Sequence, residues 1–342
     1  MELRLNQLAA HLERTLAPIY VVHGDEPLLA IEAADAIRAA AKKRGCDERE
    51  IFIVESGFKW DAFLAANANL GLFGSLKLID LRIPSGKPGV EGAKVLEACT
   101  KHLDCDQTLL ITLPKIDRAT QSSAWFSALA GAGVAIAVYP LERDELVPWL
   151  AARLSRQGQR GVPGTLALLA DRCEGNLLAA QQEIDKLGLS LPEGELAPEA
   201  VERAVTDVSR YDIFQLSEAW LAPDPPRALR IIAALEAEGT GIQLLLWQLG
   251  EDIHALASVR EAMSAGTPVA VAMRNSRVWG KRQGAMERAA RRISNEAISP
   301  LLAGLARLDA LSKGIGRGNV WDDLRTMVMA LAGMPVIAPL PW

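Results

Sequence analysis

The turn that follows the first apolar segment is where an α/β protein would bind a nucleoside triphosphate. Tyr20–Gly24 predicts a buried strand that leads directly into a helix. Backbone amides and the helix dipole at such a turn favour phosphates. A working phosphate loop then needs a second glycine, a lysine, and a serine or threonine. Counted from Gly24, these positions hold Leu29, Ala30 and Ile31, so the sequence offers neither an ammonium group for the phosphates nor a hydroxyl for magnesium.

The turn itself carries negative charge. Asp25 and Glu26 complement the helix dipole themselves and would repel a triphosphate. The later apolar segment Leu110–Leu113 runs into a Pro-Lys pair rather than into an acidic pair that could support hydrolysis. We therefore interpret Gly24, Asp25 and Glu26 as a degenerate phosphate loop, and we expect no catalysis and no cofactor. For Gly24 alone, an ordinary strand-to-helix turn is the simpler explanation.

Two apolar residues stand between glycines just before an expected strand at Leu76–Leu81. The four residues are Gly71, Leu72, Phe73 and Gly74. The glycines give the backbone freedom to present Leu72 and Phe73 as a paired tip, with the aromatic ring as an anchor in a partner's pocket. Apolar residues beside a strand are, however, more often buried in the core. The residues alone leave both interpretations open.

A basic segment lies late in the chain. Residues 274–292 have a local charge of +6, although the whole chain has a net charge of −5. Cations hold phosphates, and an indole ring can stack on an unpaired base. The segment therefore predicts a DNA-binding surface made of Arg274, Arg277, Trp279, Lys281 and Arg282, with Lys313 from a later glycine-rich loop. The alternative is a solvated helical face with Trp279 packed inside the protein.

The cysteines and histidines do not form a reactive cluster. No CxxC pair occurs, and no histidine accompanies a nucleophile; the residues are Cys46, Cys99, Cys105, Cys173, His11, His23, His102 and His254. We expect free thiols, no disulfide and no metal site.

These segments must be positioned by an α/β sheet that is followed by helices. Five short apolar segments predict buried parallel strands at Ile19–His23, Ile51–Val54, Leu76–Leu81, Thr108–Leu113 and Val134–Tyr139. Helices between them predict a sheet covered on both faces, and the first has one face made of Leu28, Ile31, Ala34 and Ile37. Further on, a long helix is expected to bury Leu245, Leu249, Ile253 and Leu256.

The fold class is therefore α/β plus all-α, and we expect three domains. They cover residues 1–140 with the parallel sheet, 141–210 as a small helical module, and 211–342 as a helical bundle. The acidic balance excludes a surface that coats nucleic acid non-specifically. The sequence has no pattern of a signal peptide or a membrane span, so we expect a cytoplasmic protein without membrane contact.

Several segments, in order along most of the chain, resemble the delta subunits of bacterial DNA polymerase III clamp loaders. These segments are Tyr20–Pro27, Asn69–Ser75, Ala124–Phe126, Glu174–Ala179, and Arg277–Trp279 with the basic pair that follows. Glu174–Ala179 is similar to the lid-helix signature of that family and is the most specific match. The pair Arg172-Cys173 resembles an arginine finger of other clamp-loader subunits, but Asp171 replaces the serine, and we interpret the pair as structural.

The resemblance implies an AAA+-like (RecA-like) domain, a helical lid and a helical collar that joins a hetero-pentamer. It also implies that the chain binds and opens a sliding clamp for loading onto primer-template DNA, while other subunits of the polymerase assembly hydrolyse ATP. Gly71–Gly74 would then be the clamp-binding segment. Two alternatives are a divergent P-loop ATPase, which the missing lysine and hydroxyl argue against, and a nucleic-acid-binding scaffold, which the acidic pI of about 5.6 disfavours.

Overall fold

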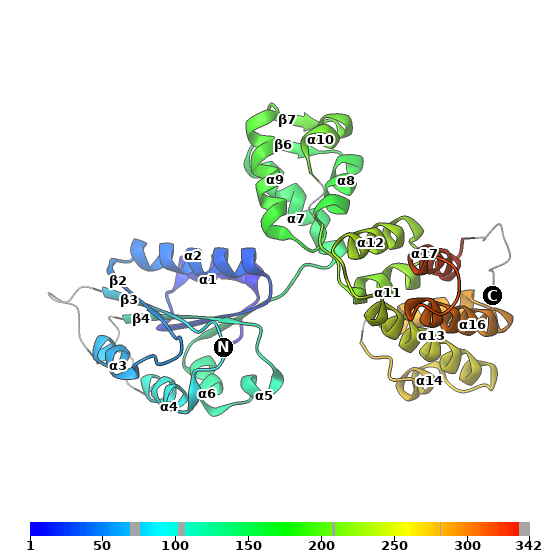
Figure 1. Cartoon of the computed structure of the whole chain (residues 1–342). Helices are drawn as coiled ribbons and strands as arrows, with labels where there is room; N and C mark the ends of the chain where they lie inside the picture. Colours follow the sequence, from blue (N-terminus) through cyan, green and yellow to red (C-terminus); the bar gives the residue numbers. More distant parts are fainter. Residues whose placement is uncertain (69–75, 102–106, 207–208, 281, 335–342) are drawn as a thin grey trace. The chain divides into compact units, whose positions relative to one another are not determined.

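A computed structural model describes residues 1–68, 76–101, 107–206, 209–280 and 282–334 (Figure 1). The chain forms two compact units, one of residues 1–153 with 177–186 and the other of residues 154–176 with 187–342. The division into three domains at residues 140 and 210 stays a prediction. Within the described residues, no helix is long and apolar enough to span a membrane.

The first unit contains a five-stranded parallel sheet with the order β2-β3-β4-β1-β5. The strands are β1 (Ile19–Gly24), β2 (Cys46–Ile53), β3 (Leu76–Arg82), β4 (Gln107–Pro114) and β5 (Val134–Val138). The central strand β1 pairs with both β4 and β5, and Val21 lies opposite Ile111 and Ala135. All five expected strands form, and four of them are mostly buried, as short apolar segments predict. The predicted burial of the strand at Ile51–Val54 is wrong, since the side chains of Ile51 and Ile53 are 48% and 44% exposed.

Strand β2 begins five residues earlier than expected, because it forms an edge of the sheet. Its first half, Cys46–Glu50, is mostly polar and exposed, which an edge strand tolerates. On the neighbouring β3, Asp80 is fully buried and accepts hydrogen bonds from Arg38 at 2.9 Å and Arg49 at 2.5 Å. Burial opposes ionisation of Asp80, but the two guanidinium groups hold the pKa of its carboxyl below the usual value.

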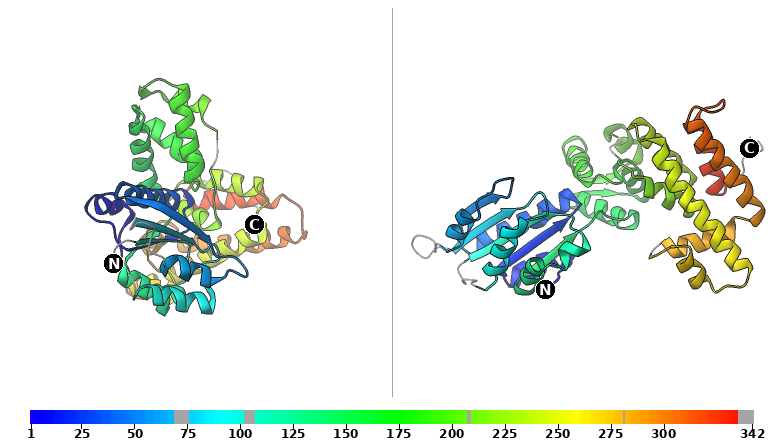
Figure 2. Two further views of the ribbon diagram at one scale, coloured as in Figure 1. Left: turned by 90° about the vertical axis from the view of Figure 1, so that its left-hand side faces the viewer. Right: turned by 60° about the horizontal axis from the view of Figure 1, so that its bottom comes forward.

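Helices cover both faces of this sheet, α1 and α2 on one and α3 to α6 on the other (Figures 1 and 2). They are η1 (Leu5–Gln7), α1 (Leu8–Arg14), α2 (Pro27–Lys43), α3 (Trp60–Ala68), α4 (Gly89–Cys99), α5 (Arg118–Gln121) and α6 (Ala124–Ala132). In α2 the predicted burial of Ile31 is wrong, since its side chain is 51% exposed. The buried stripe runs through Leu29, Ala33, Ile37 and Ala41 at four-residue spacing, and Ile31 lies on the opposite side of the helix.

Residues 143–204 are helical, as expected, but also contain two short strands. The elements are α7 (Arg143–Arg156), β6 (Gln159–Gly161), α8 (Pro163–Cys173), α9 (Leu177–Ser190), β7 (Gly194–Leu196) and α10 (Pro198–Ala204). Strands β6 and β7 pair in parallel, and Thr165 donates a hydrogen bond to the Leu196 carbonyl at 2.8 Å. Strands of three residues are too short to show a hydrophobic period in the sequence.

The remaining described residues form a bundle of helices around one core. The helices are α11 (Ile213–Leu221), α12 (Pro225–Ala237), α13 (Ile242–Ser264), α14 (Val269–Asn275), α15 (Arg282–Arg292), α16 (Asn295–Ser312) and α17 (Val320–Leu331). The predicted face of α13 is confirmed, because Leu245, Leu249, Ile253 and Leu256 are all buried. Figure 2 shows α13 as a long straight helix of this bundle. The parallel sheet and the helical residues that follow it confirm the α/β plus all-α fold class.

Candidate functional site

The turn after β1 packs too closely for any residue larger than glycine. A Cβ atom on Gly24 would lie 1.6 Å from the carbonyl oxygen of Val138 on β5. The next amide, of Asp25, donates a hydrogen bond to the same oxygen at 3.1 Å. Gly24 is therefore explained by strand packing alone, and no ligand is needed to account for it.

The N-terminus of α2 is capped by a carboxylate of the chain itself. Glu26 is the N-cap residue, 6% exposed, and its Oε1 accepts a hydrogen bond from the Leu28 amide at 3.3 Å. Burial raises the pKa of this carboxyl, and the nearby charge of Asp25 adds to the effect. Asp25 itself forms an ion pair with Lys115 at 2.6 Å. The carboxylate of Glu26 thus takes an amide that would otherwise face a phosphate.

The predicted clamp-binding residues Gly71, Leu72, Phe73 and Gly74 lie outside the described residues. The structure does describe how the chain is held on each side of them. Lys77, 7% exposed at the start of β3, donates a hydrogen bond to the Ala66 carbonyl near the end of α3 at 3.1 Å. The same ammonium forms an ion pair with Glu50 of β2 at 2.6 Å. Gln107 on β4 donates to the Asn67 carbonyl at 3.0 Å. Lysine at the start of an apolar strand is the signal that could have identified this anchor.

One exposed part of the basic segment is the turn that ends α14. The amide of Val278 donates to the Met273 carbonyl at 2.9 Å, and the amide of Arg277 donates to the Arg274 carbonyl at 3.2 Å. This is the hydrogen-bond pattern of a Schellman C-cap, with Arg277 at the left-handed position (φ +56°) where glycine is usual. Val278 is buried and anchors the turn, whereas Trp279 is 59% exposed. The alternative in which Trp279 is packed inside the bundle is wrong.

The predicted DNA-contact residues fall into two groups. Arg274 and Arg277 are exposed, and among the described residues neither has an ion pair. Arg282 instead forms an ion pair at 2.6 Å with Asp252, which is 2% exposed. Lys313 pairs with Asp309 one helical turn away, at 2.7 Å.

The carboxylate that binds Arg282 belongs to a buried polar network. Asp252 on α13 also accepts hydrogen bonds from Gln248 at 2.8 Å and from the Ser217 hydroxyl on α11. The network around Asp252 therefore links α11, α13 and α15, and the guanidinium group of Arg282 is paired inside the bundle. Lys281, next to it, lies outside the described residues.

The turn Glu174-Gly175-Asn176 connects α8 to α9 and contacts the residues that lead into the helical bundle. A Cβ atom on Gly175 (φ +77°) would lie 1.9 Å from the Arg210 carbonyl oxygen. The Glu174 carbonyl accepts a hydrogen bond from the Arg210 amide at 2.8 Å. Its carboxylate, 5% exposed, accepts two hydrogen bonds from Arg227 of α12, at 2.6 and 3.1 Å. This segment is thus a packed junction.

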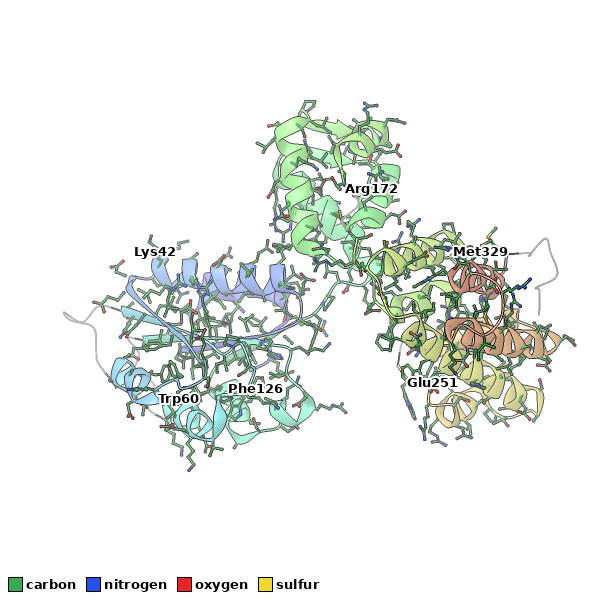
Figure 3. The ribbon with its side chains drawn as sticks, in the orientation of Figure 1. Lys42, Trp60, Phe126, Arg172, Glu251 and Met329 are labelled. Carbon is green, nitrogen blue, oxygen red and sulfur yellow. The ribbon has the colours of Figure 1, made fainter. Side chains whose placement is uncertain are left out.

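The pair that precedes this junction is structural, as interpreted from the sequence. Arg172, labelled in Figure 3, donates hydrogen bonds to the carbonyl groups of Glu202 and Val205. Cys173 is fully buried. Both side chains are thus engaged within the chain.

Comparisons with known proteins give consistent matches along the chain. Residues 20–138 match the family model for "DNA polymerase III, delta subunit", and residues 213–338 match the model for the C-terminal part of the processivity clamp loader gamma complex. DNA polymerase III subunit delta of Escherichia coli is 30% identical over 330 residues, which are 96% of each chain. The same subunit of Haemophilus influenzae is 25% identical over 329 residues, covering 93% of this chain and 95% of that one. A clamp loader delta protein of Bacillus subtilis with a solved structure is 17% identical, with a TM-score of 0.49 over 96% of this chain and 100% of that one.

Proposed function

Because the chain belongs to the family of DNA polymerase III delta subunits, we propose that it binds a sliding clamp and opens it for loading onto primed DNA, without hydrolysing ATP itself. Membership in this family gives the chain the role of a clamp-loader component of DNA polymerase III. Its partners in this proposal are the clamp, the other subunits of a hetero-pentamer joined through residues 211–342, and primer-template DNA.

The capped N-terminus of α2 is the main support for the proposal that the chain does not hydrolyse ATP. Glu26 occupies an amide at the place where phosphates would bind, and the positions for lysine and serine or threonine hold Ala30 and Ile31. A divergent P-loop ATPase would need a cation free for the phosphates here, whereas the turn carries two carboxylates and the nearby Lys115 is paired with Asp25. Incubation with ATP and magnesium should show no phosphate release. Phosphate release from ATP by the isolated chain would support the ATPase alternative.

Clamp binding is assigned to Leu72 and Phe73, as the family resemblance implies. The anchors at Lys77 and Gln107 hold the described chain on both sides of this segment. A subunit can open a ring only if it binds the open form more tightly than the closed form. The tip would supply the affinity, and contacts near it would supply the difference between the two forms.

The test is the affinity of the purified chain for the sliding clamp of its own organism. The double substitution Leu72→Ala and Phe73→Ala should abolish tight binding, because buried aromatic anchors commonly contribute about 2 kcal/mol or more. Ile31→Ala and Val90→Ala are matched controls, since both side chains are apolar and exposed (51% and 80%). Failure of the folded wild-type chain to bind the clamp would reject the proposal.

The assembled loader should contact DNA through the turn that ends α14. Trp279 is exposed between an anchored Val278 and a glycine, with Arg274 and Arg277 beside it. Stacking on one base contributes about 1–3 kcal/mol, or roughly 5- to 150-fold in affinity. Trp279→Ala should therefore weaken DNA binding by the assembled complex within this range. Trp247→Ala is the matched control, because its side chain is also 59% exposed.

The salt dependence separates this surface from a merely solvated helical face. Replacing Arg274 and Arg277 by alanine should make the fall of DNA affinity with salt less steep, by up to about 0.7 in slope for each phosphate that is no longer neutralised. If DNA affinity and its salt dependence are both unchanged in this variant, Arg274 and Arg277 are solvated side chains that do not contact DNA. Arg282→Ala is a poor choice for this test, since it also breaks the pair with Asp252.

A further inference from the structure

A cavity of about 600 Å³ lies in the first unit, on the face of the sheet that carries α5 and α6. Its floor is formed by the ends of two neighbouring strands, because His23 on β1 lies in register with Ala137 on β5. Phe126 of α6, labelled in Figure 3, forms one wall, and the N-terminal residues form another. The degenerate phosphate loop leads into α2 on the opposite face, so the cavity is a separate feature.

His23 is the buried polar group that lines this cavity without a partner of its own. Its side chain is 94% buried, and no hydrogen bond joins its ring to another described residue. The Phe126 ring packs edge to face against it, with centroids 5.3 Å apart at 86°, and fixes the plane of the imidazole. Burial lowers the pKa of His23, and the charge of Glu2 only partly opposes this. At neutral pH the ring therefore offers one donor and one acceptor.

The remaining polar groups surround the mouth of the cavity. Glu2 supplies a carboxylate and Arg4 supplies a guanidinium group. Gln7 supplies its Nε2, because its Oε1 accepts a hydrogen bond from the Arg4 amide at 3.2 Å, and Gln121 supplies its Oε1, because its Nε2 donates to the Ile116 carbonyl at 3.3 Å. Arg4 is exposed and, among the described residues, forms no ion pair. The N-terminal residues are held in place, because the Leu3 amide donates to the Ala135 carbonyl at 2.9 Å and the Ala135 amide donates to the Met1 carbonyl at 2.9 Å.

We propose that this cavity binds a nucleobase, with the attached phosphate directed toward Arg4. A neutral imidazole, two amides and a carboxylate provide the mixed donors and acceptors that read the edge of a base, and Phe126 provides an apolar aromatic wall. The volume lies within the range of small-molecule sites, about 300–1,000 Å³. The base belongs either to a free mononucleotide or to a nucleic-acid strand, since both present the same edge. This site is independent of clamp opening and of the Trp279 surface.

The experiment follows the imidazole resonances of His23 by NMR in the full-length chain. With four histidines in the sequence, the His23 signals can be assigned by comparison with His23→Gln. Each of the four nucleoside 5′-monophosphates is added in one series, and a single-stranded oligonucleotide is added in another. Saturable shifts with a mononucleotide support a free nucleotide as ligand. Shifts that appear only with the oligonucleotide, and not with an abasic oligonucleotide of equal length, support a base within a strand.

Two substitutions connect the shifts to the cavity. Ala137→Phe fills the cavity from its floor and should weaken binding at least about tenfold. Arg4→Ala should weaken binding of a mononucleotide more than of the corresponding nucleoside, whereas Arg118→Ala, an exposed arginine outside the cavity, should change neither. The absence of any His23 shift in the folded wild-type chain, with all mononucleotides and with the oligonucleotide, overturns the proposal. Shifts that persist unchanged in Ala137→Phe overturn it as well.

Discussion

Arg227→Met should be among the most destabilising single substitutions of a charged side chain in this protein. The Arg227 and Glu174 side chains are only 8% and 5% exposed, and two guanidinium nitrogens lie 2.6 and 3.1 Å from one carboxylate oxygen. Methionine retains most of the apolar volume but removes the charge. A buried carboxylate that loses its cation costs about 3–5 kcal/mol.

The same helix offers a matched control. Arg230 lies three residues further along α12 and forms an ion pair with Asp171 at 2.7 Å. These two side chains are 35% and 28% exposed, so water screens their interaction. Arg230→Met should therefore cost only about 0–1 kcal/mol. Both arginines contact the segment before Gly175, and burial is the main difference between them.

The assay is urea unfolding of the full-length chain, followed by circular dichroism. The free energy of unfolding is compared between wild type, Arg227→Met, Arg230→Met and the double variant Glu174→Gln with Arg227→Met. The double variant removes both charges and should be more stable than Arg227→Met alone. Equal losses for Arg227→Met and Arg230→Met would refute the reasoning, and so would a double variant no more stable than Arg227→Met.

Three further predictions concern other positions in both units. Gly175→Ala should lower the free energy of unfolding by more than about 2 kcal/mol, because it combines a left-handed backbone with a Cβ 1.9 Å from the Arg210 carbonyl oxygen. Urea unfolding measures this loss, and a loss under about 1 kcal/mol would contradict the prediction. Gly24→Ala should lower the melting temperature of the first unit, because its Cβ would clash with the Val138 carbonyl; an unaltered melting temperature would show that the backbone adjusts. Burial lowers the pKa of His23, so protonation favours the unfolded chain, and the free energy of unfolding should fall as the pH drops below about 6.5. Between about pH 7.5 and 5 it should decline less steeply in His23→Gln than in the wild type. Equal slopes in the two proteins would exclude His23 as a cause.

Much of the fold could be predicted because its signals are local. Four buried strands appear as short apolar segments, and the core face of α13 appears as apolar residues three or four apart from Leu245 to Leu256. The differences arise from tertiary context. The polar half of β2 is a strand only because β3 pairs with it at the edge of the sheet. Ile31 fits a helical period with Leu28, but the direction of the sheet decides which stripe of α2 is buried.

For the candidate DNA-binding surface, the sequence predicted which residue types are present but not which of them are paired inside the protein. The basic segment and Trp279 stand together in the sequence, but the partner of Arg282 is Asp252, thirty residues away on another helix. The sequence contains no sign that this arginine differs from Arg274 and Arg277. In the same way, the sequence indicates only that Glu174 belongs to a turn, and its counter-ion lies fifty-three residues further on.

The sequence by itself determined that no lysine or hydroxyl follows Gly24, and hence that a phosphate loop is missing, because side-chain chemistry is fixed by residue identity. It also determined the order of the five sheet strands and the longer helices between and after them, since these depend on neighbouring residues. Only the tertiary structure decided that Glu26 caps α2, that Lys77 anchors the chain beside Gly71–Gly74, and that His23 faces a cavity. Burial and pairing join residues distant in sequence, and they decide which charges are engaged inside the protein and which remain available to a partner.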